Sequence, residues 1–216
     1  MTEPEAVILV HGLWVPGVVM ALLQRRIGRC GYRTLNYTYP SMRLTLTENA
    51  ERLARYCRGI GAARLNFVGH SLGGLVVLAM LERPREFAIG RVVLAGTPYD
   101  GSIAARSLAR LPGGRTALGS CLPEWLGRER PKLPLHYQFG VIAGSLSIGL
   151  GRLVAPDMAR PNDGVVSVSE TRFPEMHDHI VLDVNHTGML LSRTVARQIC
   201  EFLRHGAFAK ESFSPP

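Results

Sequence analysis

A serine flanked by glycines stands where an apolar run gives way to a helical pattern. Ser71 is the centre of the pentapeptide Gly-His-Ser-Leu-Gly at residues 69–73, between the apolar runs 65–68 and 74–81. Gly-x-Ser-x-Gly between a strand and a helix forms a sharp turn that exposes the serine hydroxyl. A neighbouring base can then make this hydroxyl a nucleophile. The motif therefore predicts nucleophilic attack by Ser71, and a tight turn without chemistry is the alternative.

A base for Ser71 and an acid to orient that base are both present further along the chain. His186 follows the predicted strand 180–184, and an imidazole takes up and returns protons near neutral pH. Asp163, in the turn-forming sequence Asn-Asp-Gly, is the candidate that accepts the second N–H of this histidine. The order serine, acid, histidine matches one of the known chain orders of serine triads. Asp100, after an earlier predicted strand, is the main alternative acid.

Chemistry of this kind also needs backbone N–H groups that stabilise a developing oxyanion. One donor is expected from Leu72, at the start of a predicted helix whose dipole favours negative charge. The second is expected from Leu13, because Gly12 frees the chain to turn after the first predicted strand. Trp14, next in this loop, is assigned to substrate binding, and a place in the core is the alternative.

Other histidines carry weaker signals. His177 and His179 flank Asp178 in a His-x-His pattern, which could suggest a metal. No third ligand follows at a clear spacing, so a partly exposed strand entrance is the favoured interpretation. His70, inside the pentapeptide, is expected to pack rather than react. The sequence predicts neither a metal nor a cofactor.

The elements that must position these residues follow from the hydrophobic pattern. Short apolar runs alternate with longer helical patterns, which is typical of βαβ units and of a parallel sheet buried on both faces. Predicted strands cover 6–10, 33–39, 65–68, 92–95, 138–143 and 180–184. Predicted helices cover 18–27, 47–57 with Thr47 as its N-cap, 72–81 and 189–204. The sequence predicts one α/β domain over 1–216, with about six mostly parallel strands and helices on both faces.

One stretch interrupts this alternation. Residues 99–134 contain several prolines and glycines around short apolar segments, and they carry more basic than acidic side chains. A long insertion of this kind inside a compact domain is usually functional, so we expect a cap or lid. Residues 209–216 are expected to form a disordered tail.

Composition limits the partners. The chain has 216 residues and a formal net charge of +8, and 23 of its 25 basic residues are arginine. No dense basic run with interleaved aromatic residues occurs, so nucleic-acid binding is not expected. A weak attraction to an anionic membrane surface stays open. The sequence does not address the oligomeric state.

Cysteines and the first residues bear on location. The four cysteines, Cys30, Cys57, Cys121 and Cys200, are widely spaced, so reduced and mostly buried thiols are expected. The acidic start leads directly into a predicted core strand, unlike a signal peptide. No apolar run approaches the ~20 residues of a membrane span. These features predict a cytoplasmic protein, with export by another route left open.

Taken in order, five motifs resemble those of the α/β-hydrolase superfamily, and in particular of small bacterial esterases and lipases and PGAP-type lipid deacylases. They are Val10–Leu13, Gly69–Gly74, Ala95–Pro98, Asn162–Val166 and Asn185-His186. The resemblance implies an α/β-hydrolase fold with a reduced sheet, since two edge strands of the larger fold are missing. It departs from related lipases after the third motif, where these often carry a histidine and a basic residue. No calcium loop of the larger lipases is evident.

The resemblance also implies roles. Ser71 would be the nucleophile of an acyl-enzyme mechanism, His186 its base and then acid, and Asp163 the orienting carboxylate. Leu13 and Leu72 would supply the oxyanion donors. We therefore expect a serine hydrolase of carboxylic esters, acting on a small ester or a lipid with an apolar acyl chain. An acyltransferase with the same acyl-enzyme and a noncatalytic binding protein on this scaffold are the alternatives.

Overall fold

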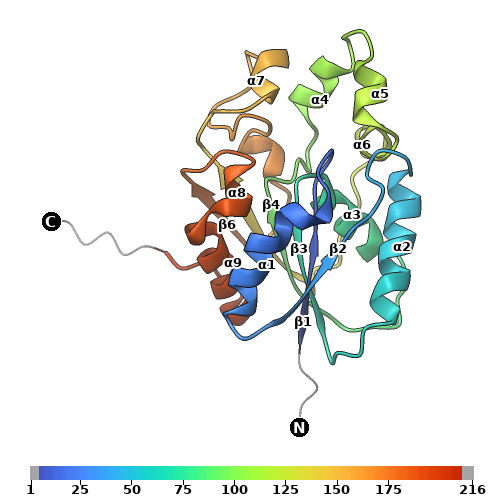
Figure 1. Cartoon of the computed structure of the whole chain (residues 1–216), viewed down its shortest axis with the longest axis vertical. Helices are drawn as coiled ribbons and strands as arrows, with labels where there is room; N and C mark the ends of the chain where they lie inside the picture. The colour runs from blue at the N-terminus through green and yellow to red at the C-terminus, as the bar shows by residue number, and fades with distance from the viewer. Residues whose placement is uncertain (1–4, 211–216) are drawn as a thin grey trace, which may run out of the picture.

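A parallel β-sheet forms the centre of the computed structural model, which describes residues 5–210 (Figure 1). Its six strands within the described residues lie in the order β2 (Arg33–Tyr37), β1 (Ala6–Val10), β3 (Leu65–His70), β4 (Ile89–Ala95), β5 (Gln138–Gly144) and β6 (Asp178–Leu182). Every neighbouring pair is parallel. All residues of β1 and β3 are buried, as expected for strands that are covered on both faces. The predicted fold class is confirmed.

Helices cover both faces of the sheet. One face carries α2 (Leu46–Arg58) and α3 (Leu72–Leu81), and the other carries α1 (Ala21–Gly28) and α9 (Arg193–His205). Every residue of α3 is buried, which explains why its sequence is apolar on all sides. The shorter helices are η1 (Gly17–Met20), α4 (Ile103–Leu108), α5 (Gly114–Leu118), α6 (Cys121–Leu126), α7 (Gly151–Val154), η2 (Ser169–Thr171) and α8 (Gly188–Leu191). In Figure 1, α4, α5 and α7 lie at the end of the molecule opposite the N-terminus.

The N-cap of helix α2 lies two residues earlier than its sequence suggested. Thr45 is the N-cap, and its hydroxyl accepts the backbone N–H of Glu48 while the Glu48 carboxylate accepts the backbone N–H of Thr45. This reciprocal pair is a capping box. The prediction of Thr47 as the N-cap is wrong, because its hydroxyl donates instead to Glu124 at 2.6 Å.

The last predicted helix is two helices. Ser192 adopts an extended conformation between α8 and α9, and its hydroxyl accepts the backbone N–H of Val195. A serine in this position caps a new helix, which is why the pattern over 189–204 does not form one rod. Strand β6 also ends at Leu182, so His186 lies in a loop four residues beyond the strand.

The segment 99–134 is partly built into the core. Trp125 of α6 is fully buried and donates its indole N–H to the Tyr99 carbonyl at 3.0 Å. Leu118 and Leu122 join the same core cluster as α2 and α3. The part of the segment from Leu118 to Trp125 therefore packs in the core. Motion of the segment as a lid stays a prediction.

Two cysteines correct the expectation of reduced thiols. Cys30, just after α1, and Cys200, in α9, form a disulfide across two helices that share one face of the sheet. Disulfides persist mainly in oxidising compartments, so this pairing does not favour a cytoplasmic location. Cys57 and Cys121 are buried free thiols, and burial raises the pKa of each to about 12.

The end of the described chain is anchored at Ala209. Its backbone N–H donates to the Gln198 side-chain oxygen, and its carbonyl accepts the Gln198 amide, both at 2.9 Å. The remainder of the predicted tail, 211–216, lies outside the described residues. Within 5–210, no helix has the length and apolar character needed to cross a membrane.

Candidate active site

Ser71 occupies the single residue between β3 and α3, in a backbone conformation that side-chain-bearing residues rarely adopt. Its φ is 54° and its ψ is −126°. The neighbouring structure holds this conformation, since the Ser71 N–H donates to the Ala95 carbonyl at 2.9 Å and its carbonyl accepts the Gly74 N–H at 3.0 Å. Strain of this kind costs about 1–3 kcal/mol and clusters at functional sites. The predicted strand–turn–helix context of Ser71 is thus present.

The glycines of the pentapeptide are required by close backbone approach. A Cβ at Gly69 would lie 2.4 Å from the Gly74 Cα, and a Cβ at Gly73 would lie 2.2 Å from the Val10 carbonyl oxygen. Neither position has room for a larger side chain. These contacts seat α3 against the ends of β1 and β3.

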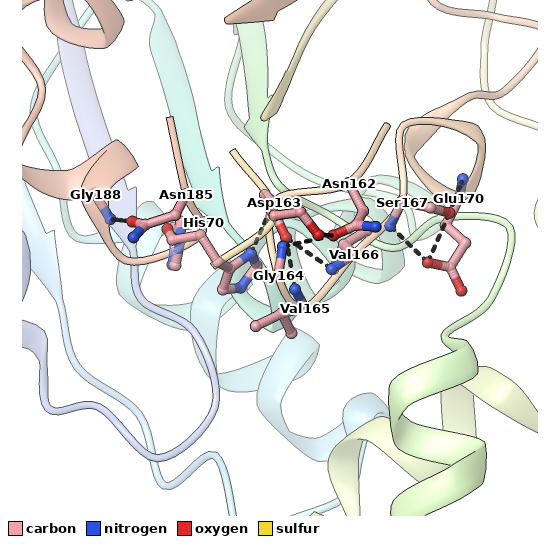
Figure 2. A network of polar contacts seen from close by, with 12 residues as sticks. His70, Asn162, Asp163, Gly164, Val165, Val166, Ser167, Glu170, Asn185 and Gly188 are labelled. Carbon is pink, nitrogen blue, oxygen red and sulfur yellow. Dashed lines mark hydrogen bonds and ion pairs between the residues drawn. The ribbon is translucent and has the colours of Figure 1, made fainter. Parts of the chain in front are cut away.

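Asp163 and His186 form a close pair. The His186 Nδ1 lies 2.7 Å from Asp163 Oδ2, and the Asp163 side chain is almost fully buried. Asp163 Oδ1 accepts the backbone N–H groups of Val165 at 2.9 Å and Val166 at 2.7 Å. Figure 2 shows how these bonds fix the carboxylate within its own loop. The carboxylate therefore points one oxygen at the imidazole, and the other ring nitrogen stays available for proton transfer.

The loop that carries Asp163 is itself braced. Asn162 Oδ1 accepts the Gly164 N–H at 3.0 Å and the Ser147 hydroxyl at 2.6 Å. Further along, Glu170 Oε2 accepts the backbone N–H and hydroxyl of Ser167, as Figure 2 also shows. Gly164 has a φ of 89°, so the Asn-Asp-Gly turn needs its glycine.

Gly96 makes room for the pair, a role the sequence reasoning missed. A Cβ at Gly96 would lie 3.0 Å from His186 Nδ1 and 3.2 Å from Asp163 Oδ2. Its φ of 58° also favours glycine. The signal was the Ala-Gly-Thr-Pro motif at the end of β4, which the sequence analysis used only as one of the five motifs of the resemblance.

Asp100 lies elsewhere. Its side chain is exposed, and its backbone N–H donates to the Glu170 carbonyl. No contact joins it to His186 in the described structure. The structure thus brings Asp163, and not the alternative acid, to the histidine.

The residue before Ser71 contacts the histidine of the pair. The His70 and His186 rings lie 4.8 Å apart between centroids, and His70 Nε2 donates to the His186 carbonyl at 3.0 Å. No hydrogen bond joins the Ser71 hydroxyl to the His186 ring within the described residues. Catalytic contacts in ligand-free enzymes are often longer than in the working complex. The triad of Ser71, Asp163 and His186 stays a prediction.

The two expected oxyanion donors are free. Among residues 5–210, no acceptor bonds the backbone N–H of Leu13 or Leu72. Gly12 runs directly past the serine, since a Cβ at this position would lie 3.0 Å from the Ser71 Cβ. Leu72 is the first residue of α3, where N–H groups have no partner within the helix. Both groups can therefore donate to a bound ligand.

Trp14 lies at the surface and not in the core. It is 52% exposed with a φ of 62°, and its indole N–H donates to the Ala117 carbonyl of α5 at 2.6 Å. It borders a cavity of about 370 Å³. The other lining residues are His11, Val15, Pro16, Thr38, Tyr39, Pro40, Ser41, Met42 and Arg43. A role in binding substrate stays a prediction with a cavity to support it.

The His-x-His pair makes ordinary contacts. Phe139 donates its backbone N–H to His177 Nδ1 at 3.3 Å, and His179 Nε2 lies 3.2 Å from the Thr171 hydroxyl. The part of the chain that the structure describes holds no cluster of three or more metal-ligating side chains.

Burial makes the stability of the fold sensitive to acid. It lowers the pKa of His70 to about 3 and that of His179 to about 4, and it also lowers the pKa of His11. The unfolded chain therefore binds more protons than the folded one between about pH 6.5 and these values.

We expect the free energy of unfolding to be fully retained above about pH 6.5 and to fall as the pH drops toward 3. His70 contributes up to about 1.4 kcal/mol per pH unit in this window, because the folded state keeps it neutral. Urea unfolding at several pH values measures the slope. His70→Gln should flatten it, whereas His136→Gln, at an exposed position, should not. An equal slope in His70→Gln would contradict the assignment.

The chain is similar to a known protein family and to several solved structures. A sequence model described as the alpha/beta hydrolase family matches residues 7–201. No curated protein matches the chain. Among solved structures, the mature Bacillus licheniformis lipase BlEst2 superposes with a TM-score of 0.72 at 20% identity, covering 95% of this chain and 92% of that one.

Two other hydrolases have a similar fold. The metagenomic carboxyl esterase MGS0156 gives a TM-score of 0.66 at 19% identity, over 86% of this chain and 65% of that chain. A pyrethroid hydrolase from Sphingobium faniae gives 0.61 at 12% identity, over 94% and 98%. At such identities the likeness extends to the fold alone.

Proposed function

Because this chain belongs to the alpha/beta hydrolase family, we propose that it is a serine hydrolase that cleaves carboxylic esters through an acyl-enzyme. The observation that carries the proposal is the buried Asp163–His186 pair, which lies beside the strained turn at Ser71. A carboxylate bonded to one imidazole nitrogen keeps the other nitrogen as a base. The esterases and lipases among proteins of the same fold support this reaction class.

In the proposed reaction, His186 takes the proton of the Ser71 hydroxyl as the serine oxygen attacks the ester carbonyl. The resulting oxyanion is stabilised by the backbone N–H groups of Leu13 and Leu72, which are free to donate. His186 then gives its proton to the leaving alcohol, and the acyl group stays on Ser71. Water, activated by the same histidine, attacks the acyl-enzyme and releases the acid. Asp163 holds the ring throughout and stabilises its charged form.

Two apolar surfaces support a substrate with an apolar acyl chain. The cavity beside Trp14 starts at the loop whose Gly12 lies against Ser71. A second surface, here called the apolar rim, consists of Leu146, Ile148, Leu150 and Leu153, which are 37%, 61%, 69% and 80% exposed.

The apolar rim adjoins the loop that carries the catalytic acid. A Cβ at Gly151, between Leu150 and Leu153, would lie 2.6 Å from the Gly164 carbonyl oxygen, so the rim segment packs closely on the residue after Asp163. Exposed apolar groups in such numbers mark contact sites for ligands or lipids. With the net charge of +8, the rim supports a weak association with an anionic membrane surface.

A chain-length series of nitrophenyl esters tests the proposal. We expect kcat/KM to rise about fourfold per methylene while the chain still fits, because burying one methylene is worth about 0.8 kcal/mol. Trp14→Ala should flatten this dependence. Leu135→Ala removes an exposed apolar side chain outside the cavity, at 79% exposure against 52% for Trp14, and should leave the dependence unchanged. A long-chain optimum with activation at an interface would define a lipase, and a short-chain optimum an esterase; no turnover of any ester would contradict the proposal.

A further inference from the structure

The His11 side chain, at the end of β1, is fixed at both ring nitrogens. Its Nδ1 lies 2.9 Å from the Gly12 carbonyl oxygen, and its Nε2 lies 3.2 Å from the Tyr39 backbone nitrogen. A carbonyl oxygen only accepts and a backbone N–H only donates, so Nδ1 carries the proton and Nε2 carries a lone pair. The surroundings therefore select one neutral tautomer of His11.

Tyr39 also prevents the ring from turning. Its hydroxyl donates to the His11 carbonyl at 2.9 Å, and its ring stacks on the imidazole at 4.4 Å between centroids with 20° between the planes. His11 is 1% exposed and Tyr39 is 4% exposed. Burial lowers the pKa of His11, which keeps the ring neutral.

The bond to Gly12 has a consequence for the next residue. The Gly12 carbonyl and the Leu13 N–H belong to one planar trans peptide, so they point in opposite directions. A carbonyl held by His11 therefore fixes the direction of the Leu13 N–H. A flipped peptide would place the carbonyl oxygen where the donor stands, and an oxygen there would repel an oxyanion.

We infer that His11 is a positioning residue for the oxyanion donor: its Nδ1–H holds the Gly12 carbonyl and thereby aims the Leu13 N–H, and Tyr39 locks the tautomer that does so. The inference rests on the proposed function, in which Leu13 stabilises the oxyanion. His11 acts through the peptide and touches no reacting atom. The sequence assigned it no role of its own.

Two amide substitutions separate this role from a merely structural one. In His11→Asn, the side-chain N–H₂ can take the place of Nδ1 and donate to the Gly12 carbonyl. In His11→Gln, the longer side chain reaches the place of Nε2, where its oxygen accepts the Tyr39 N–H but leaves the carbonyl unheld. Both lose the stacked ring, so a structural role would affect them alike.

We expect His11→Gln to lower kcat about 10²–10³-fold, the effect typical of losing one oxyanion donor, with KM changed less than about threefold. His11→Asn should keep kcat within about tenfold of the unsubstituted protein, because its donor replaces Nδ1. The affinity for an alkylboronic acid, which forms a tetrahedral adduct on serine, should fall in His11→Gln by the same factor as kcat/KM. Equal losses in the two variants, or a loss confined to KM, would overturn the inference.

A measurement on the unsubstituted protein needs neither folding of a variant nor turnover. Imidazole nitrogen chemical shifts should show His11 neutral with its proton on Nδ1 at pH 7. A proton on Nε2 would overturn the inference whatever the activity. If the proton is on Nδ1 and no ester is turned over, the proposed function is contradicted, but the bond from His11 to the Gly12 carbonyl is not.

Discussion

Ser71→Ala should remove all measurable ester hydrolysis, a loss of about 10⁵–10⁶ in kcat, because the variant has no atom that can carry the acyl group. The turn itself should persist. Alanine carries the same Cβ as serine, and the backbone bonds from residue 71 to Ala95 and Gly74 do not involve the hydroxyl. Turnover of nitrophenyl esters and labelling by a fluorophosphonate probe measure the effect.

A second substitution at the same position separates activity from stability. Ser71→Gly should be as inactive as Ser71→Ala but more stable by about 1–3 kcal/mol, because glycine relieves the strain at a φ of 54°. Ser120→Ala, at an exposed serine, serves as the control and should keep full activity and labelling. Activity retained in Ser71→Ala would show that another group is the nucleophile. Absence of labelling in the unsubstituted protein would favour a noncatalytic binding protein.

Asp163→Asn should lower kcat about 10⁴-fold, the loss seen when an amide replaces the acid of such a triad. The amide nitrogen would face His186 Nδ1 and favour the wrong tautomer of the ring, while the side-chain oxygen can still accept the N–H groups of Val165 and Val166. The geometry would survive and the base would be lost. Steady-state kinetics of purified variants with comparable melting temperatures measure the difference.

Asp100→Asn provides the matched comparison. Asp100 is exposed and does not contact His186, so this variant should keep kcat within about twofold, as for a surface change away from the site. A larger loss at Asp100 than at Asp163 would mean that the working enzyme uses the other carboxylate. Product analysis with added acceptor alcohols, run on the same preparations, distinguishes hydrolysis from acyl transfer.

Sequence predicts the central strands well because burial on both faces leaves an unbroken apolar run, as in β1 and β3. It fails at the edge. Strand β6 is only half-buried, so it begins with two polar residues, Asp178 and His179, and not with an apolar run. The predicted strand therefore begins and ends two residues late. The N-cap of α2 can be predicted from the sequence, because Thr45 and Glu48 have the spacing of a capping box; the prediction of Thr47 does not use that spacing.

At the candidate site, the sequence predicts which side chains lie together but not what orients them. Asp163 and His186 could be paired from their order and motifs. The disulfide could not, because Cys30 and Cys200 are 170 residues apart and meet only when α1 and α9 pack on the same face. The space that Gly96 leaves beside Asp163 and His186 depends on backbone direction, which residue types do not specify. The same is true of the bond from His11 to the Gly12 carbonyl.

The Cys30–Cys200 bridge also changes what a cut in the chain would do. Ser71, Asp163 and His186 all lie inside the covalent ring that the bridge closes. A protease that nicks the exposed residues around Leu111 or Leu153 would therefore leave two fragments joined in one molecule. Such a nicked protein would migrate as an intact chain on a gel run without reductant and separate only when thiol is added. Its two halves would stay at high effective concentration, so the site could reassemble after a cut that would otherwise disperse it.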